Sequence, residues 1–343
     1  MPNSILTEAI EAASSGTDLS AEAAAGVLLE IMEGRASEVQ TAGFLIALRA
    51  KGETVEELAG LARTMRELAL RVSTGRDDLL DTAGTGGGRP TFNVSTTAAF
   101  VAAGAGCAVA KHGNRSATGL CGSADVLEAL GARIDLEPEA VVECIEEIGF
   151  GFMFAPRHHA ATRHVVPVRR ELAVRTIFNF LGPLTNPAGA RRQLIGVSDP
   201  AYLGVVAGAL RQLGGTSALV VSSEDGLDEI SISGATRMVE LRDGRVEELS
   251  LRPEDVGLEP APADAVGAGN PERNAAIVRQ VLSGSSGPER SLTVLNAGAA
   301  IYVGAGATSI EEGVRAAEQA IDSGAAGNTL ERFVERTVAL GAS

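Results

Sequence analysis

A glycine-rich run followed by a hydroxyl-rich helix start is the first place in this sequence where residue types and spacing predict chemistry. A short apolar run at 79–83 leads into GTGGG at 84–88, and NVST at 93–96 opens an Ala/Gly-rich stretch. Glycines let backbone N–H groups approach an anion closely, and a Ser or Thr N-cap at the positive end of a helix dipole is an anion seat. The segment therefore predicts a phosphate site. The alternative is an ordinary turn before a helix, since the run matches neither GxGxxG nor GxxxxGK[ST].

Lysine usage favours the phosphate interpretation. The chain has 29 basic residues, and the only lysines are Lys51 and Lys111. Lys51 lies at what reads as a polar helix end with no special demand, whereas Lys111 follows the apolar run CAVA at 107–110 and leads into HGNR at 112–115. A compact ammonium kept here, in a chain that otherwise uses arginine, indicates a phosphate contact that a planar guanidinium would not fit. Retention by chance is the alternative.

Alternating strands and helices are predicted to position these residues. From about residue 73, short apolar strands are followed by helices, which is typical of a mostly parallel sheet with helices on both faces. The predicted strand and helix pairs are 79–83 with 95–106, 107–110 with 123–130, 151–154 with a helical stretch, and 193–197 with 200–213, and a strand at 217–221 leads into a loop. Ligands bind beyond the carboxyl ends of such strands. The glycine run, KHGN at 111–114 and EDGLDE at 224–229 all fall at such ends, so the motifs converge.

The remaining sequence predicts a second, helical part. Residues 1–72 read as helices, with capping boxes at 37–40 and 54–57 and C-terminal glycines at Gly34 and Gly52. We expect 1–72 to form a small helical domain and an insertion at about 160–187 to pack back on it as the second wall of a cleft. Residues 73–159 and 188–343 would form the α/β domain. It would include a hairpin around 242–245 at the sheet edge and a helix at 271–282.

Composition limits the class of protein. At 343 residues the chain can form one large or two ordinary domains. Its net charge is −15 and its isoelectric point about 4.8. A nucleic acid as the main partner is therefore disfavoured, because phosphate contacts need clustered Lys and Arg. We interpret the basic residues near 157–192 as part of a small-anion pocket.

The N-terminus and the cysteines indicate a reduced, cytoplasmic setting. Cys107, Cys121 and Cys144 form no CxxC motif, so we expect reduced thiols and no disulfide framework. The N-terminal residues lack a basic and then apolar signal, and the apolar run at 98–110 is too short to span a bilayer. All four histidines lie in the predicted cleft, but no carboxylate or cysteine stands at ligand spacing, so hydrogen-bonding roles are favoured over a metal site.

Taken together, the motifs resemble those of the anthranilate phosphoribosyltransferase family, the second enzyme of tryptophan biosynthesis. The resemblance runs over nearly the whole chain and rests on GTGG at 84–87, TFNVST at 91–96, KHGNR at 111–115, GSADVLEALG at 122–131, VRREL and RTIFNFLGPLTNP between 168 and 187, and DGLDEIS at 225–231. It implies a helical domain joined to an α/β domain, usually as a homodimer through the helical domain. It also implies transfer of a phosphoribosyl group from phosphoribosyl pyrophosphate (PRPP) to the amino group of anthranilate, with Mg²⁺ required.

The resemblance also implies site residues. PRPP would be held by Gly84, Gly86, Gly87, Thr91, Asn93, Ser95, Thr96, Lys111 and Gly119. Magnesium would be held by Ser95, Asp228 and Glu229, which suits an ion that takes one or two protein oxygens and keeps waters. Anthranilate would be held by Gly84, Asn114, His159 and Arg169. Lys111, Arg169 and Glu229 are the candidate catalytic residues.

Two departures from the family pattern bear on PRPP affinity and metal dependence. The family usually reads GTGGD, whereas here Gly88 replaces the aspartate and Arg89 follows it. A Ser-Ser pair is common where this chain has Thr118 and Gly119, which loses one hydroxyl donor. Two other classes share this architecture: a pyrimidine nucleoside phosphorylase, which typically is longer and lacks the KHGN and VRREL pieces, and a non-catalytic nucleic-acid-binding relative, which should show a basic face.

Overall fold

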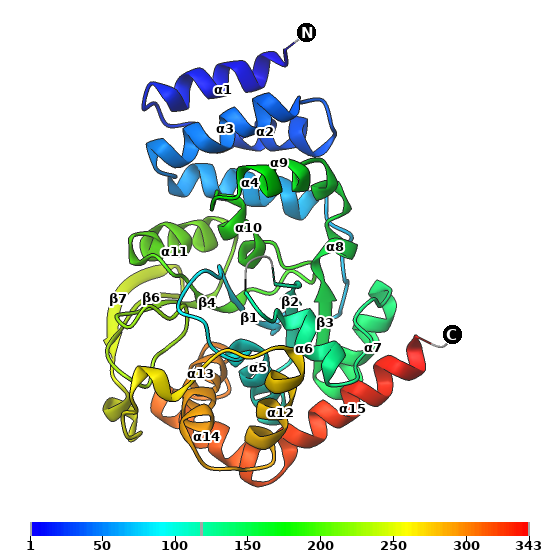
Figure 1. Cartoon of the computed structure of the whole chain (residues 1–343), viewed down its shortest axis with the longest axis vertical. Coiled ribbons are helices and arrows are strands. Elements are labelled where there is room, and N and C mark those ends of the chain that lie inside the picture. The colour runs from blue at the N-terminus through cyan, green and yellow to red at the C-terminus, as the bar shows by residue number, and fades with distance from the viewer. Residues whose placement is uncertain (1, 117–118, 342–343) are drawn as a thin grey trace.

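The N-terminal part of the chain is a bundle of helices. The computed structural model describes residues 2–116 and 119–341, and its first helices are α1 (Ser4–Ser14), α2 (Ala21–Met32), α3 (Glu38–Lys51) and α4 (Val55–Glu67) (Figure 1). The capping box predicted at the start of α4 is confirmed, because the Thr54 and Glu57 side chains exchange hydrogen bonds with the backbone there. The box predicted at α3 is only half formed. Ser37 accepts from the Gln40 backbone, but the Gln40 side chain bonds the backbone of Asn3 instead, which ties α3 to the start of α1.

The second part is built on one seven-stranded sheet, with strand order β3-β2-β1-β4-β5-β6-β7. The strands are β1 (Leu80–Gly84), β2 (Val109–Gly113), β3 (Phe150–Phe154), β4 (Arg192–Gly196), β5 (Ser217–Ser223), β6 (Thr236–Arg242) and β7 (Arg245–Leu251). The first five run parallel, and β6 and β7 form an antiparallel hairpin at the edge. The predicted mostly parallel sheet and its edge hairpin are thus confirmed. The chain changes direction across the sheet between β1 and β4, which is the switch point where ligands bind in open α/β sheets.

Side chains along the strands alternate between two cores. Leu194, Leu219 and Met238 belong to a core below the sheet, whereas their neighbours Ile195 and Val220 belong to a core above it. This alternation follows from the two-residue period of a strand. The lower core includes α5 (Val94–Gly104), α6 (Ser123–Ala129), α7 (Pro138–Ile148), α12 (Pro271–Leu282), α13 (Pro288–Val303), α14 (Ile310–Asp322) and α15 (Ala325–Leu340). The helix predicted at 271–282 is therefore confirmed.

The upper core joins the sheet to the helical bundle. It contains residues of α11 (Leu203–Gln212) and of α2, α3 and α4, together with residues between 165 and 184. That segment follows the short helix α8 (Ala155–His158) and forms α9 (Val166–Leu172), which contacts α3, and α10 (Phe178–Leu184), which contacts α4 and β2 (Figure 1). The segment thus lies between the bundle and the carboxyl ends of the strands. No helix among residues 2–116 and 119–341 is both long and apolar enough to cross a bilayer.

Candidate active site

The acidic loop after β5 lies directly on the ends of β1 and β4. Gly84 pairs with Gly196 at the last position of the two strands. A Cβ at Gly196 would lie 1.7 Å from the Asp228 carbonyl oxygen, and a Cβ at Gly84 would lie 3.0 Å from the Asp228 carboxylate. Position 196 therefore needs glycine for the loop to pass, and a side chain at position 84 would require the Asp228 carboxylate to shift. Sequence reasoning had missed Gly196, although its place at the end of an apolar strand was a usable signal.

Lys111 is buried at the centre of this edge. Its side chain is among the largest fully buried ones, and Nζ donates to the Thr82 carbonyl at 2.5 Å and approaches Thr82 Oγ1 at 3.3 Å and Ser95 Oγ at 3.4 Å. Burial lowers the pKa of Lys111, while the negative charges of Asp81 and Glu229 raise it. The contacts are those of a compact point charge among oxygens, and they bring Lys111, Ser95 and Glu229 together.

The two acidic residues of the loop share one shielded position. Burial and, to a lesser extent, the neighbouring Asp228 charge raise the pKa of Glu229 to about 8, against the opposing effects of Lys111 and the Ser95 backbone. Burial also raises the pKa of Asp228, against backbone hydrogen bonds that include one from Gly86. Two carboxyl groups held side by side with little solvent need a cation to keep both charges.

The start of α5 differs from the prediction in one respect. The N-cap is Asn93, not a serine or threonine, and its side chain makes no capping hydrogen bond. The Asn93 amide instead donates to the Cys121 carbonyl at 3.2 Å, and its oxygen accepts from Asn274 at 2.8 Å. Ser95 and Thr96 lie in the first turn. Two of the first-turn N–H groups already have partners: the Val94 N–H donates to the Phe92 carbonyl at 2.7 Å, and the Ser95 N–H donates to the Glu229 carboxylate. The start of α5 is thus tied to the acidic loop, and Asn93 adds no side-chain cap.

Two hydroxyls beside this helix start have no partner. Thr91 Oγ1 and Thr96 Oγ1 are both shielded from solvent, and neither makes a hydrogen bond within the part of the chain that the structure describes. A buried hydroxyl without a partner costs free energy, so such groups indicate a missing ligand or water. Both residues belong to the TFNVST motif, next to the glycine run.

The second wall carries His159 and Arg169. His159 and His112 are buried, with ring centroids 5.1 Å apart, and they donate to the carbonyls of Thr185 and Gly182, each at 3.1 Å. Burial lowers the pKa of His159 to about 4 and that of His112 well below its usual value, so both rings are neutral at pH 7.

Arg169 is a cation of this wall that the histidines do not supply. Its guanidinium lies 5.3 Å from the centre of the Phe178 ring, and within residues 2–116 and 119–341 it has no carboxylate partner. Arg170 points to solvent. Asn114 is exposed, and its side-chain oxygen accepts from the Arg115 backbone at 2.7 Å. No hydrogen bond among the described residues joins Asn114 to His159 or Arg169.

Arg175 is a residue that sequence reasoning had missed. It follows α9, and its guanidinium donates to the backbone carbonyl of Gly86 and lies 3.4 Å from that of Thr85. Its own carbonyl accepts from the Arg49 side chain of α3 at 2.6 Å. The helical bundle thus reaches the glycine run through this arginine. The signal in the sequence was weak, because Arg175 and Gly86 are 89 residues apart.

The two positions that depart from the family pattern have defined surroundings. A Cβ at Gly88 would lie 2.7 Å from the Asp228 backbone nitrogen and 2.8 Å from the Gly226 carbonyl, so this position is closely packed. Gly119 is exposed, and its N–H donates to Ser116 Oγ at 2.7 Å. Thr118 lies outside the described residues.

Lys51 does not have the undemanding position that its sequence context predicted. Its side chain is 4% exposed, and Nζ contacts Asp18 at 2.6 Å and Glu57 at 3.1 Å. The prediction was wrong because Asp18 is 33 residues away in the sequence. Both lysines of the chain therefore occupy shielded positions where a small ammonium bonds several oxygens.

Metal-binding capacity at the strand ends is limited to a few oxygens. No group of three or more His, Cys, Asp or Glu side chains among the described residues could enclose a metal ion. Ser95, Asp228 and Glu229 offer a hydroxyl and two carboxylates close to the anion seat. This donor set fits Mg²⁺, which is usually bound by one or two carboxylates together with substrate phosphates.

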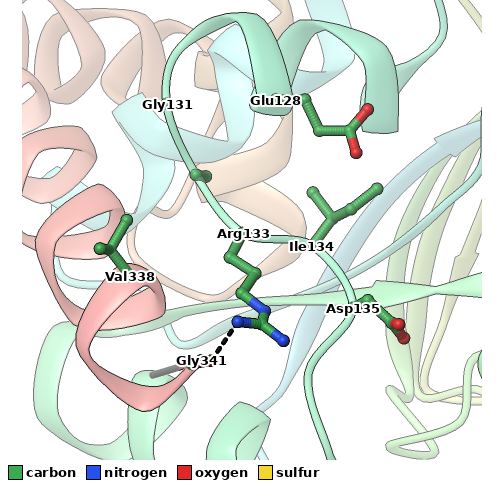
Figure 2. A pocket seen from close by; sticks show the side chains of 8 residues that line it. Glu128, Gly131, Arg133, Ile134, Asp135, Val338 and Gly341 are labelled. Carbon is green, nitrogen blue, oxygen red and sulfur yellow. Dashed lines mark hydrogen bonds between the residues drawn. The ribbon is translucent and has the colours of Figure 1, made fainter.

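A separate hollow of about 500 Å³ lies beside the C-terminal helix (Figure 2). The charged groups around it are already paired: Arg133 donates to the Gly341 carbonyl, Glu128 pairs with Arg115, and Asp135 pairs with Arg157. None of the sequence-predicted site residues lines it. We therefore place the candidate site at the strand ends and not here.

Family models match both parts of the chain. The model described as glycosyl transferase family, a/b domain, matches residues 76–327, and that described as glycosyl transferase family, helical bundle domain, matches residues 7–69. The first match covers more than half of the chain.

Individual relatives agree with these models. The chain is 56% identical over 332 residues to the anthranilate phosphoribosyltransferase of Rubrobacter xylanophilus, covering 96% of this chain and 97% of the relative. A crystal structure of anthranilate phosphoribosyltransferase from Thermus thermophilus superposes with a TM-score of 0.91 at 47% identity, covering 96% of this chain and 99% of that one. The Saccharomyces cerevisiae enzyme in complex with PRPP and Mg superposes with a TM-score of 0.90 at 28% identity, covering 98% and 99%.

Proposed function

The chain belongs to the anthranilate phosphoribosyltransferase family, and from this premise we infer its reaction. It transfers the 5-phosphoribosyl group of PRPP to the amino group of anthranilate, giving N-(5-phosphoribosyl)anthranilate and pyrophosphate in tryptophan biosynthesis, and it depends on Mg²⁺. The observation that carries this conclusion is the convergence of the glycine run, buried Lys111 and the Asp228 and Glu229 pair at the carboxyl ends of neighbouring strands.

The nucleophile of this reaction, the amino group of anthranilate, needs little activation by the protein. An aromatic amine is already neutral at pH 7, so its lone pair is available without a strong base. The main tasks are to stabilise the departing pyrophosphate and to hold the two substrates in line. The strand ends with the buried Lys111 ammonium serve the first task, and the second wall with the Arg169 guanidinium serves the other.

The phosphate-bearing substrate would occupy the strand ends. Its proposed binding residues are Gly84, Gly86, Gly87, Thr91, Asn93, Ser95, Thr96, Lys111 and Gly119. The unpartnered hydroxyls of Thr91 and Thr96 beside the start of α5 support this assignment. Ser95, Asp228 and Glu229 would hold Mg²⁺, which when bound neutralises charge on the pyrophosphate.

Anthranilate would lie against the second wall. Arg169 would bind its carboxylate, with His159, Asn114 and Gly84 completing the proposed set. The neutral histidines and the partly shielded, unpaired guanidinium support this choice, because one cation without an acidic neighbour favours one carboxylate.

We propose that the chain divides into a helical domain, 1–72 with 160–187, and an α/β domain, 73–159 with 188–343, and that it forms a homodimer through the helical domain in the cytoplasm. Apolar side chains on the bundle support the dimer: Val39 is 82%, Ile5 43% and Ile46 40% exposed. A hollow of about 760 Å³ lies between α1 and α3 beside Ile46. Exposed apolar surface of this kind is typical of an interface. Light scattering should give twice the monomer mass, and Val39→Glu with Ile46→Glu should lower it.

One assay separates this function from the two related classes. Purified protein with PRPP and Mg²⁺ should consume anthranilate, which is measured as a fall in anthranilate fluorescence. The fluorescence should stay constant when either PRPP or Mg²⁺ is withheld. Phosphorolysis of uridine or thymidine without loss of anthranilate would indicate a nucleoside phosphorylase instead. Nucleic-acid binding with neither activity would indicate the non-catalytic relative.

A further inference from the structure

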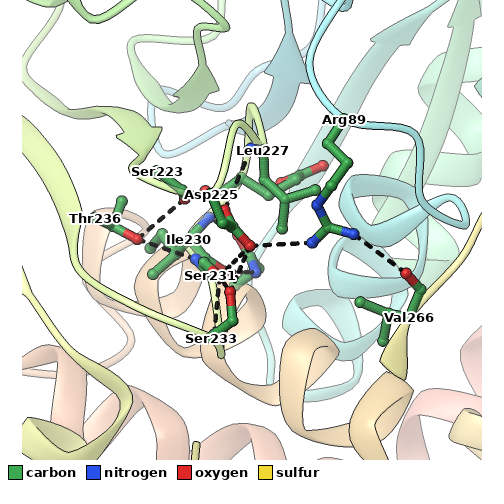
Figure 3. Close-up of polar contacts among 11 residues, drawn as sticks. Arg89, Ser223, Asp225, Leu227, Ile230, Ser231, Ser233, Thr236 and Val266 are labelled. Carbon is green, nitrogen blue, oxygen red and sulfur yellow. Dashed lines mark hydrogen bonds and ion pairs between the residues drawn. The ribbon is translucent and has the colours of Figure 1, made fainter. Parts of the chain in front are cut away.

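An ion pair joins the glycine-rich loop to the acidic loop. Arg89 follows the glycine run and Asp225 lies in the turn after β5, 136 residues away, with 3.0 Å between Arg89 Nη2 and Asp225 Oδ2 (Figure 3). Arg89 Nη1 also donates to the Val266 carbonyl at 3.3 Å. Both side chains are mostly shielded, with 26% and 14% of their surface exposed. The pair is thus a partly buried bridge and not a surface contact.

Asp225 is held firmly on its own side of the bridge. Its Oδ2 accepts from Ser231 Oγ at 2.8 Å and from Ser233 Oγ at 2.5 Å (Figure 3). Burial raises the pKa of Asp225, but hydrogen bonds from Ser233, Ser231 and Arg89 outweigh it, so the pKa is lowered. The group is therefore a carboxylate at neutral pH, and the bridge joins two full charges.

The backbones of the two loops touch at the same place. The Arg89 N–H donates to the Gly226 carbonyl at 2.6 Å. A Cβ at Gly88 would come within 2.7 Å of the Asp228 backbone nitrogen. Glycine at 88 therefore permits the close approach of the two loops, and Arg89 joins them through its backbone N–H and its side chain.

The acidic loop has a separate anchor away from this bridge. Asn296 of α13 accepts from the Ile230 N–H and donates to the Ile230 carbonyl, each at 2.9 Å. Removing the bridge would therefore leave the acidic loop attached to the fold. The backbone bond from Arg89 to Gly226 and the hydrogen bond from the Gly86 backbone to Asp228 would then hold the glycine run and the acidic loop together without the ion pair.

We propose that Arg89 and Asp225 are positioning residues for substrate binding: their ion pair holds the acidic loop at the register in which Asp228 and the glycine run can both contact one magnesium-bound pyrophosphate. The inference rests on the proposed function of the strand ends. Neither residue needs to touch the substrate, because each acts through the loop that carries it. Loss of the bridge should weaken binding of the pyrophosphate end and leave the anthranilate wall unchanged.

The test compares Arg89→Gln, Asp225→Asn and the double variant with the wild-type chain. Each single change should raise the KM for PRPP by about 5- to 50-fold, with the KM for anthranilate within about threefold, since coupled neighbours give effects of this order. The KM for PRPP of the double variant should exceed that of the more affected single variant by no more than about twofold, because each single change already removes the same bridge. Arg315→Gln, which breaks the exposed pair with Glu311, is the matched control and should leave both KM values unchanged.

Three outcomes would overturn the proposal: equal loss for the two substrates, multiplied effects in the double variant, or an unchanged KM for PRPP. Should Asp225→Asn fail to fold by circular dichroism, Arg89→Gln and Arg89→Lys decide the question, and the lysine variant should recover part of the affinity. Calorimetric titration with magnesium and PRPP in the absence of anthranilate measures PRPP binding when no transfer can occur. The role of the bridge in binding can therefore be tested independently of the reaction. An inactive wild-type chain would refute the function, whereas the binding differences among variants would still test the bridge.

Discussion

The guanidinium of Arg175 occupies the space that a side chain at Gly87 would need: a Cβ there would lie 1.7 Å from Arg175 Nη1. Arg175 also donates to the Gly86 carbonyl. Because a peptide group is planar and trans, its N–H points away from its C=O. The contact therefore turns the Gly87 N–H away from Arg175, and the second wall sets the orientation of the loop proposed to bind phosphate.

Gly87→Ala should consequently raise the KM for PRPP by about 5- to 150-fold, since overpacking costs on the order of 1–3 kcal/mol and the guanidinium that must move is bonded to Gly86. Gly16→Ala is the matched control. Gly16 has a φ of +77°, close to the +84° of Gly87, but nothing lies within 4 Å of its Cβ position. Gly16→Ala therefore measures the effect of backbone strain without a steric clash. If Arg175→Ala added to Gly87→Ala brought no recovery, the steric explanation would be wrong.

Lys111→Arg should fail to replace the lysine. The ammonium lies among Thr82 and Ser95 oxygens in a fully buried position, and a guanidinium is larger and planar. We expect the KM for PRPP to rise in Lys111→Arg nearly as much as in Lys111→Ala. Lys51→Arg is the control, because it changes the other shielded lysine far from the strand ends and should affect thermal stability only. A near-normal KM in Lys111→Arg would contradict the point-charge argument.

Glu229→Gln should leave the fold intact and strongly lower the rate of turnover. The amide keeps the shape of the side chain but removes the charge that Asp228 and Glu229 together offer to Mg²⁺. The measurement is the rate at sub-millimolar Mg²⁺, with melting temperature as the check on folding. Glu224→Gln changes an exposed carboxylate of the same loop and should retain activity. Wild-type rates for Glu229→Gln under these conditions would refute the metal assignment.

The fold and the composition of the site could be predicted because they depend on local patterns. Apolar periodicity located the strands and helices to within a few residues, and strand ends in a parallel sheet necessarily meet at one edge. The contacts that fix the geometry are not local. Arg175 reaches Gly86 across 89 residues and Arg89 reaches Asp225 across 136. Lys51 was misread for the same reason, since its partner Asp18 precedes it by 33 residues.

Gly88→Asp should change the response to Mg²⁺, and the structure adds a steric effect. The new carboxylate would stand beside Asp228, but its Cβ would lie 2.7 Å from the Asp228 nitrogen, so the two loops must move apart. Gly88→Ala separates these effects because it has the bulk without the charge. We expect both variants to raise the KM for PRPP and only the aspartate to shift the optimal Mg²⁺ concentration. Identical Mg²⁺ profiles for the two variants would show that a charge at 88 does not act on the metal.

Arg169→Ala should weaken anthranilate binding selectively. Adjacent helical positions point about 100° apart, and Arg169 lies partly shielded over Phe178 while Arg170 points to solvent. A guanidinium that binds a carboxylate in a partly dry pocket contributes on the order of 1.5–3 kcal/mol, roughly 10- to 150-fold in affinity.

The KM for anthranilate should therefore rise by about that factor in Arg169→Ala, while the KM for PRPP stays within about threefold, because the lost contact is remote from the phosphates. Arg170→Ala is the matched control and should change neither. The histidines cannot take over the role, since burial lowers the pKa of His159 to about 4 and keeps the ring neutral. If Arg170→Ala proved the damaging change, or if Arg169→Ala weakened PRPP as much as anthranilate, the second wall would not be the anthranilate site.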